Sequence, residues 1–132
     1  MTKIKKIKKI IPIILSAFLL SACVSSGKNS GYRQITMAEA VKMMAEKTNY
    51  IILDVRRADE YAEGHIPGAI NVANEDIGTD EITELPDKSQ LILVYCRSGR
   101  RSKIAAQSLA DLGYTNVMEF GGIIDWEYET VK

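Results

Sequence analysis

The sequence has few cysteines and histidines, and it has no apolar run long enough to span a membrane. Its 132 residues include two cysteines and one histidine, too few for a metal-ligand cluster. A membrane-spanning helix needs about 20 apolar residues, whereas the run at residues 10–20 has 11 and is interrupted by Pro12. We therefore expect no metal and no other cofactor, and a permanent transmembrane span is the weaker interpretation of this run.

The N-terminal segment has the order of a secretory signal, which is basic, then apolar, then small. Five lysines precede the run at residues 10–20, and small residues follow it as far as Cys23. Residues 20–23, Leu-Ser-Ala-Cys, resemble the lipobox of bacterial lipoproteins, in which the cysteine is acylated and becomes the new N-terminus. This resemblance implies a signal peptide at 1–22, a lipid on Cys23 and a location outside the cytoplasmic membrane. The alternative is an ordinary cleavage site with a chance cysteine.

Removal of residues 1–22 would change the charge and the cysteine content of the chain. It leaves 12 basic and 17 acidic side chains, a net charge of −5. An acidic domain argues against nucleic acid as the partner, because nucleic-acid binding leaves a basic stripe. With Cys23 acylated, Cys96 is the only remaining thiol and cannot form an intramolecular disulfide. An unpaired thiol in an exported protein is a candidate reactive group.

The remaining sequence predicts a short tether and one α/β domain. Residues 23–32 include the Ser, Gly and Asn-rich stretch of a flexible tether, and 33–132 suit one independent core. Apolar runs alternate with amphipathic segments, which indicates a mainly parallel central sheet with helices on both faces. Strands are expected at 50–53, 70–72, 91–95 and 117–120, and helices from a capping box at Thr36 and Glu39 to about 47, then at 58–63, 102–112 and 123–130.

Residues 96–102, Cys-Arg-Ser-Gly-Arg-Arg-Ser, leave a buried strand and enter a helix. Small residues at Ser98 and Gly99 allow a tight turn whose amide groups can form an anion-binding nest. The helix N-terminus adds the positive end of its dipole, and three arginines add permanent cations. Such a field favours a thiolate at Cys96. The alternative is an inert, buried cysteine beside a solvated helix start.

Three motifs of the chain resemble the rhodanese family of sulfurtransferases. The loop at 96–101 looks like the family's six-residue active-site loop. Asp54-Val55-Arg56, with Glu60 and residues 64–69, is similar to the family's D-x-R segment and the E-x-x-x-G-H-I-x-G-A segment that follows it. Gly121-Gly122-Ile123, with Trp126, is similar to its G-G-x-x-x-W ending. The resemblance covers residues 33–129 and implies a rhodanese-like fold.

The resemblance also implies a reaction and a site. The Cys96 thiolate takes the outer sulfur of an anionic donor such as thiosulfate, and the resulting persulfide passes that sulfur to cyanide, a small thiol or a protein acceptor. Such covalent transfer predicts ping-pong kinetics. The loop would bind the donor and the persulfide through Arg97, Ser98, Gly99, Arg100, Arg101 and Ser102.

For residues away from the loop, roles follow from general tendencies. Asp54 and Arg56 are expected to orient the loop arginines more than to touch substrate. Glu60 is either a charge at the edge of the site or a surface charge of its helix. His65 is expected to be a hydrogen-bonded structural residue rather than a proton shuttle, and Trp126 to pack the last helix on the core.

Two other functions fit parts of the sequence. The same loop would serve a membrane-tethered carrier that holds persulfide or polysulfide without efficient turnover. Cysteine phosphatases and arsenate reductases also surround a cysteine with arginine and an anion nest. Related phosphatases use one residue more than the six at 96–101, which makes that activity the less favoured one.

Overall fold

The computed structural model describes residues 31–78 and 80–132. The expected signal peptide, the acylated Cys23 and the tether up to residue 30 lie outside the described residues. None of the helices in the described part of the chain has the length and apolar character that crossing a bilayer requires.

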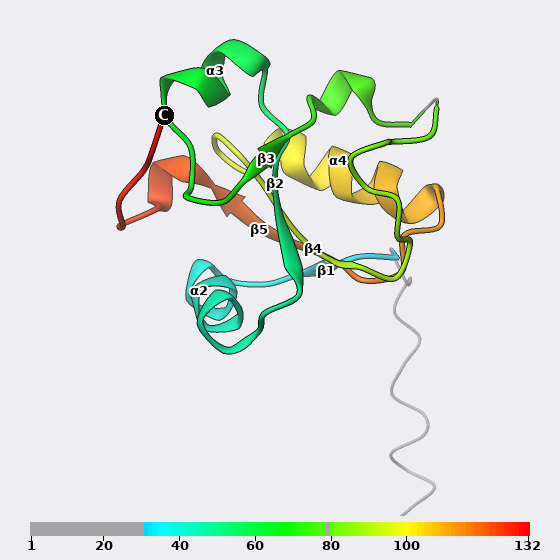
Figure 1. The fold of residues 1–132 in the computed structure, drawn as a ribbon, viewed down its shortest axis with the longest axis horizontal. Helices are drawn as coiled ribbons and strands as arrows, with labels where there is room; N and C mark the ends of the chain where they lie inside the picture. Colours follow the sequence, from blue (N-terminus) through cyan, green and yellow to red (C-terminus); the bar gives the residue numbers. More distant parts are fainter. Residues whose placement is uncertain (1–30, 79) are drawn as a thin grey trace, which may run out of the picture.

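The domain is built around a parallel five-stranded sheet in the order β1-β5-β4-β2-β3 (Figure 1). All four pairings between neighbouring strands are parallel. The strands are β1 (Arg33–Gln34), β2 (Tyr50–Asp54), β3 (Ile70–Asn71), β4 (Leu91–Cys96) and β5 (Val117–Gly122). The expected parallel α/β architecture is confirmed, and β1 is an addition that was not predicted from the sequence.

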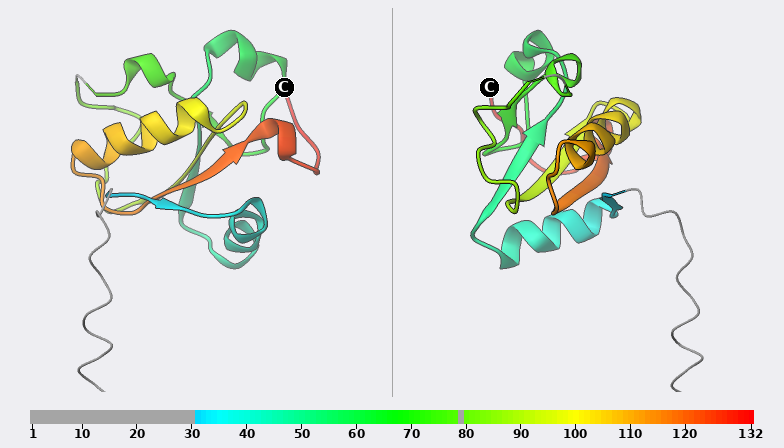
Figure 2. Two further views of the ribbon diagram at one scale, coloured as in Figure 1. Left: turned by 180° about the vertical axis from the view of Figure 1, so that it is seen from behind. Right: turned by 90° about the vertical axis from the view of Figure 1, so that its right-hand side faces the viewer.

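Helices cover both faces of this sheet. The strands pass between α2 (Met37–Glu46) and α4 (Arg100–Asp111) in Figures 1 and 2. The face under α4 buries Ala105, Ala106 and Leu109 against alternate residues of the strands, and the face under α2 buries Ala40 with the residues that point the other way. All six residues of β4 are buried, as expected for a central parallel strand covered on both sides.

Local signals explain where the helices begin and end. Thr36 and Glu39 form the expected capping box of α2, with Thr36 Oγ1 accepting from the Glu39 amide at 3.1 Å and Glu39 Oε2 accepting from the Thr36 amide at 2.7 Å. Helix α3 (Ala58–Glu63) matches its expected range. Helix α4 begins two residues before the expected position and is followed by Gly113 at φ 98°, the left-handed conformation that glycine adopts at little cost.

The expected C-terminal helix at 123–130 is wrong. One 3-10 turn, η4 (Ile123–Asp125), follows β5, and the chain then runs back beside α3 (Figure 2). Val131 forms an antiparallel bridge with His65, with amide-to-carbonyl distances of 2.8 and 2.9 Å. The β-branched and aromatic residues of this segment have weak helix propensity, and the bridge satisfies backbone groups that a helix would otherwise use. A second 3-10 turn, η3 (Asn74–Asp76), was also not expected.

Candidate functional site

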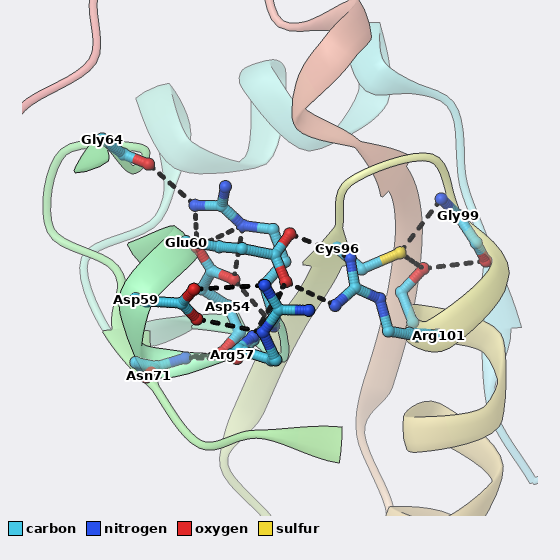
Figure 3. A network of polar contacts seen from close by, with 11 residues as sticks. Asp54, Arg57, Asp59, Glu60, Gly64, Asn71, Cys96, Gly99 and Arg101 are labelled. Atoms are coloured by element: carbon cyan, nitrogen blue, oxygen red, sulfur yellow. Dashed lines mark hydrogen bonds and ion pairs between the residues drawn. The ribbon is translucent and has the colours of Figure 1, made fainter. Parts of the chain in front are cut away.

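Cys96 is the last residue of β4 and points into the loop that leads to α4. Its Sγ accepts a hydrogen bond from the Gly99 amide at 3.0 Å and lies 3.4 Å from Ser102 Oγ (Figure 3). Gly99 has φ 103°, so the turn depends on a conformation that side chains disfavour. Cys96 is only 1% exposed and also contacts the core under α4. The sulfur thus lies at a helix N-terminus, where amide groups and the helix dipole favour negative charge.

Close packing with β5 holds this loop in place. A Cβ atom at Gly122 would overlap the Arg97 carbonyl group and lie 2.6 Å from Ser98 Cα. The Ile124 amide also donates to the Arg97 carbonyl at 3.2 Å. The Gly-Gly pair at the end of β5 therefore allows the backbone of the cysteine loop to approach this strand, and larger residues there would displace the loop.

The three loop arginines differ in their surroundings. Arg101 donates to both carboxylate oxygens of Glu60, at 2.7 and 3.1 Å. Arg97 and Arg100 are exposed and have no ion pair with any described residue. Two cations at the loop are thus free to meet an anion from solution, while the third is bound to α3.

Glu60 lies at the edge of the site, facing the loop from α3. Its hydrogen bonds with Arg101 lower the pKa of the Glu60 carboxyl from 4.5 to about 2. The same pair raises the pKa of Arg101, with a smaller contribution from the charge of Cys96. From the sequence, Glu60 could be either a site residue or a surface charge, and the structure brings it into contact with the loop.

Asp54 and Arg56 bind each other rather than the loop arginines. Arg56 donates to both oxygens of Asp54, with a shortest distance of 2.6 Å, and to the Gly64 carbonyl at 2.7 Å. Tyr95 donates to Asp54 Oδ2 at 2.7 Å. The expectation that this pair orients the loop arginines is therefore corrected. Asp54, at the end of the buried strand β2, binds the guanidinium of Arg56, two residues further along the chain. Arg56 in turn binds the Gly64 carbonyl and so holds the turn after α3.

His65 and Trp126 have structural surroundings. His65 Nδ1 lies 2.9 Å from the Tyr61 carbonyl oxygen, and its ring stacks on the Tyr61 ring with centroids 3.7 Å apart. Trp126 is half-buried against the core under α2, and its indole N–H donates to the Glu129 carbonyl at 3.1 Å. His65 is therefore hydrogen-bonded, while Trp126 packs from an extended tail instead of a helix.

A cleft of about 500 Å³ opens between α3, the cysteine loop and η4. Its walls carry cations, acids and two isoleucines, namely Arg56, Arg57, Asp59, Glu60, Glu63, Arg97, Arg101, Ile123 and Ile124. Arg57, Asp59, Glu63 and the isoleucines were not predicted as site residues, because charged residues on a short helix fit a solvated surface equally well. Over residues 31–78 and 80–132, no group of three histidine, cysteine or acidic side chains is arranged to hold a metal ion.

Glu119 is another site residue that was not predicted from the sequence. It lies in β5, is 3% exposed, and its Oε1 accepts from Ser102 Oγ at 2.6 Å and from the Gly121 amide at 2.8 Å. The signal for it was a single charge within the otherwise apolar strand 117–120. A buried charge needs hydrogen-bond partners, and here the partner is the serine that contacts Cys96.

Comparisons with known proteins agree with this geometry. The chain is 38% identical over 80 residues to thiosulfate sulfurtransferase PspE of Escherichia coli, covering 61% of this chain and 77% of the relative. It is 35% identical over 97 residues to thiosulfate sulfurtransferase GlpE of Coxiella burnetii, covering 73% and 88%. A solved E. coli structure, described as rhodanese with anions, superposes with a TM-score of 0.57 at 36% identity, covering 63% of this chain and 98% of that one.

The sequence profile of the rhodanese-like domain matches residues 36–129. This range runs from the capping box of α2 to the tail beyond η4, and it includes the cysteine loop, Glu60 and the Gly-Gly pair that packs on the loop. The sheet is parallel, and its central strand β4 ends at Cys96, just before the N-terminus of α4. The chain belongs to the rhodanese-like domain family.

Proposed function

We propose that this protein is a sulfurtransferase that carries sulfane sulfur as a persulfide on Cys96. The observation that carries the proposal is the position of Cys96 Sγ, 3.0 Å from the Gly99 amide at the start of α4 and beside exposed arginines. Relatives named as thiosulfate sulfurtransferases support the same chemistry.

In the first half-reaction the Cys96 thiolate attacks the outer sulfur of an anionic donor such as thiosulfate. A new S–S bond forms, the bond between the outer sulfur and the sulfite sulfur breaks, and sulfite leaves with the electron pair. Arg97 and Arg100 would attract the donor through long-range electrostatics, and their guanidinium groups suit oxyanion binding. Amide donors of the loop would stabilise the terminal sulfur of the persulfide.

In the second half-reaction a nucleophilic acceptor attacks the terminal sulfur. The acceptor forms a bond to that sulfur, the S–S bond to Cys96 breaks, and the thiolate returns with the electron pair. A covalent intermediate between two independent half-reactions gives ping-pong kinetics. The cleft between α3 and the loop is lined by Arg97 and Arg101 of the loop, and we expect an acceptor to approach from this side.

The direct test is intact-mass analysis after treatment with thiosulfate. We expect a gain of one sulfur atom that a reductant removes and that Cys96→Ala abolishes. Absence of the adduct would overturn the proposal. Formation of the adduct without turnover to cyanide or small thiols would favour a carrier that discharges only onto a partner.

We also propose that Cys23 is acylated and that the domain is tethered outside the cytoplasmic membrane by residues 23–32. The proposal rests on the signal-like order of residues 1–22 and on the stable anchoring that more than one acyl chain gives. It predicts fatty-acid labelling and detergent-phase partition of the chain expressed in bacteria, both lost in Cys23→Ser. Labelling that survives this substitution would contradict it.

A further inference from the structure

The buried carboxylate of Glu119 is separated from Cys96 Sγ by the hydroxyl group of Ser102. Glu119 is in β5, which the sheet order places between β1 and β4, and it is 3% exposed. Its side chain takes part in none of the ion pairs between described residues. Burying a carboxylate without a cation is costly, and a neutral side chain could accept the same two hydrogen bonds from Ser102 and Gly121.

Ser102 connects this carboxylate with Cys96. The serine hydroxyl lies 2.6 Å from Glu119 Oε1 and 3.4 Å from Cys96 Sγ. Its other neighbours are the Gly99 carbonyl at 3.0 Å and the Gly121 carbonyl at 3.4 Å. A hydroxyl has one proton to donate, and the short distance to a carboxylate marks the stronger bond. The serine oxygen is then free to accept the proton of the Cys96 thiol.

We propose that Glu119 is a positioning residue that accepts the proton of Cys96 through Ser102. The inference rests on the proposed function, because it concerns how the sulfur nucleophile is prepared. The Cys96 S–H bond breaks as an O–H bond forms on Ser102, while the original Ser102 O–H bond breaks as an O–H bond forms on Glu119. The products are a thiolate, an intact serine and a neutral carboxyl group, with no change in total charge.

The product arrangement favours the thiolate. The new Ser102 O–H points back to Sγ, so the sulfur receives hydrogen bonds from Ser102 and from the Gly99 amide. Arg101 is the loop cation whose charge interacts with Cys96, and it is bound to Glu60 from α3, while Arg97 and Arg100 are exposed. On the other side of β5, the residue of β1 in register with Glu119 is the uncharged Gln34. Glu119 is therefore the described acidic group that Ser102 can reach.

The test is the pH dependence of Cys96 alkylation by iodoacetamide in wild type and Glu119→Gln. The glutamine oxygen can still accept from Ser102 and Gly121, but it cannot take a proton. We expect alkylation at neutral pH to slow by about 100-fold, with the half-maximal rate displaced to higher pH. If Glu119 were only a fixed negative charge that repels the thiolate, Glu119→Gln would make alkylation faster. Faster or unchanged alkylation would therefore overturn the proposal.

Two further variants separate the relay from a loss of structure. Ser102→Ala should slow alkylation to a similar extent, and the double variant Ser102→Ala with Glu119→Gln should be no slower than Ser102→Ala alone. A double variant slowed by the product of the two single effects would overturn the relay, because the two residues would then act independently. Glu46→Gln, on the exposed end of α2, is the matched control and should match wild type. If wild type gives the expected alkylation profile but no persulfide with thiosulfate, the proposed function fails and the relay stands.

Discussion

Arg101 of α4 binds Glu60 of α3 through two hydrogen bonds, at 2.7 and 3.1 Å. The two residues are 41 positions apart, and their contact joins the helix that begins at the cysteine loop to the opposite wall of the cleft (Figure 3). The pairing fixes the guanidinium plane of Arg101 at the wall of the cleft, whereas Arg97 and Arg100 form no ion pair with any described residue.

Replacing Arg101 with alanine should damage catalysis more than folding. We expect kcat/KM for thiosulfate to fall by about 100-fold, the effect of losing one preorganised donor, while the domain still unfolds cooperatively. Steady-state kinetics and thermal melting measure the two effects. Lys103→Ala, an exposed cation on the same helix, is the control. A large drop in melting temperature with unchanged kinetics would contradict this role.

The pair also predicts an acid-dependent loss of stability. The Glu60 pKa is about 2 in the folded protein against 4.5 unpaired, so the stabilisation is complete above about pH 4.5 and is lost as pH falls toward 2. Urea unfolding at pH 6 should show wild type more stable than Glu60→Gln by about 2 kcal/mol. At pH 3 the difference should be clearly smaller. An equal difference at both pH values would show that proton binding to Glu60 is not involved.

Tyr95 should be a structural hydroxyl in the network of Asp54 and Arg56. It is buried, donates to Asp54 Oδ2 at 2.7 Å and accepts from the Ile66 amide at 3.1 Å, and burial raises its pKa above the usual value for tyrosine. Tyr95→Phe leaves the Ile66 amide without a partner and should cost about 1–3 kcal/mol. Denaturant unfolding checks this, with the exposed Tyr128→Phe as the neutral control. A loss below about 0.5 kcal/mol, the size of an ordinary surface effect, would contradict it.

The close approach of Gly122 to the loop predicts a steric effect on activity. Gly122→Ala places a methyl group on the Arg97 carbonyl, and displacement of the loop should lower sulfur transfer by about 100-fold. Gly113→Ala is the matched control, because Gly113 has φ 98° and a Cβ atom added there would meet no other atom within 4 Å. It should lose about 1–2 kcal/mol of stability through backbone strain and keep its activity. Full activity in Gly122→Ala would show that the loop has room to move.

Much of the fold could be predicted because its signals are local. Capping at Thr36, the glycine after α4 and the apolar strands ending at Asp54 and Cys96 act within a few residues, and each matched the structure. The tail at 123–130 could not be predicted in this way. Its conformation depends on a bridge between Val131 and His65, which are distant in sequence.

The part of the site that lies in one loop could be predicted from the sequence. The part that depends on contacts between different strands and helices could be predicted less well. The cysteine loop is continuous in sequence, so its cations and glycine were visible at once. The partners of Asp54, Glu60 and Glu119 depend on which strands are neighbours and where side chains point. The sequence alone does not indicate which of several arginines a given aspartate or glutamate will bind.

Because the sheet is parallel, the amino ends of its strands lie at one edge and the carboxyl ends at the opposite edge. Every strand runs the same way, so the backbone enters at Gly31 near the amino ends of the strands, and the sulfur lies at the far, carboxyl end of the central strand. A β4 strand of six residues spans roughly 20 Å. Anything joined to the chain on the N-terminal side of Gly31 therefore meets the domain at the end of the sheet opposite the sulfur.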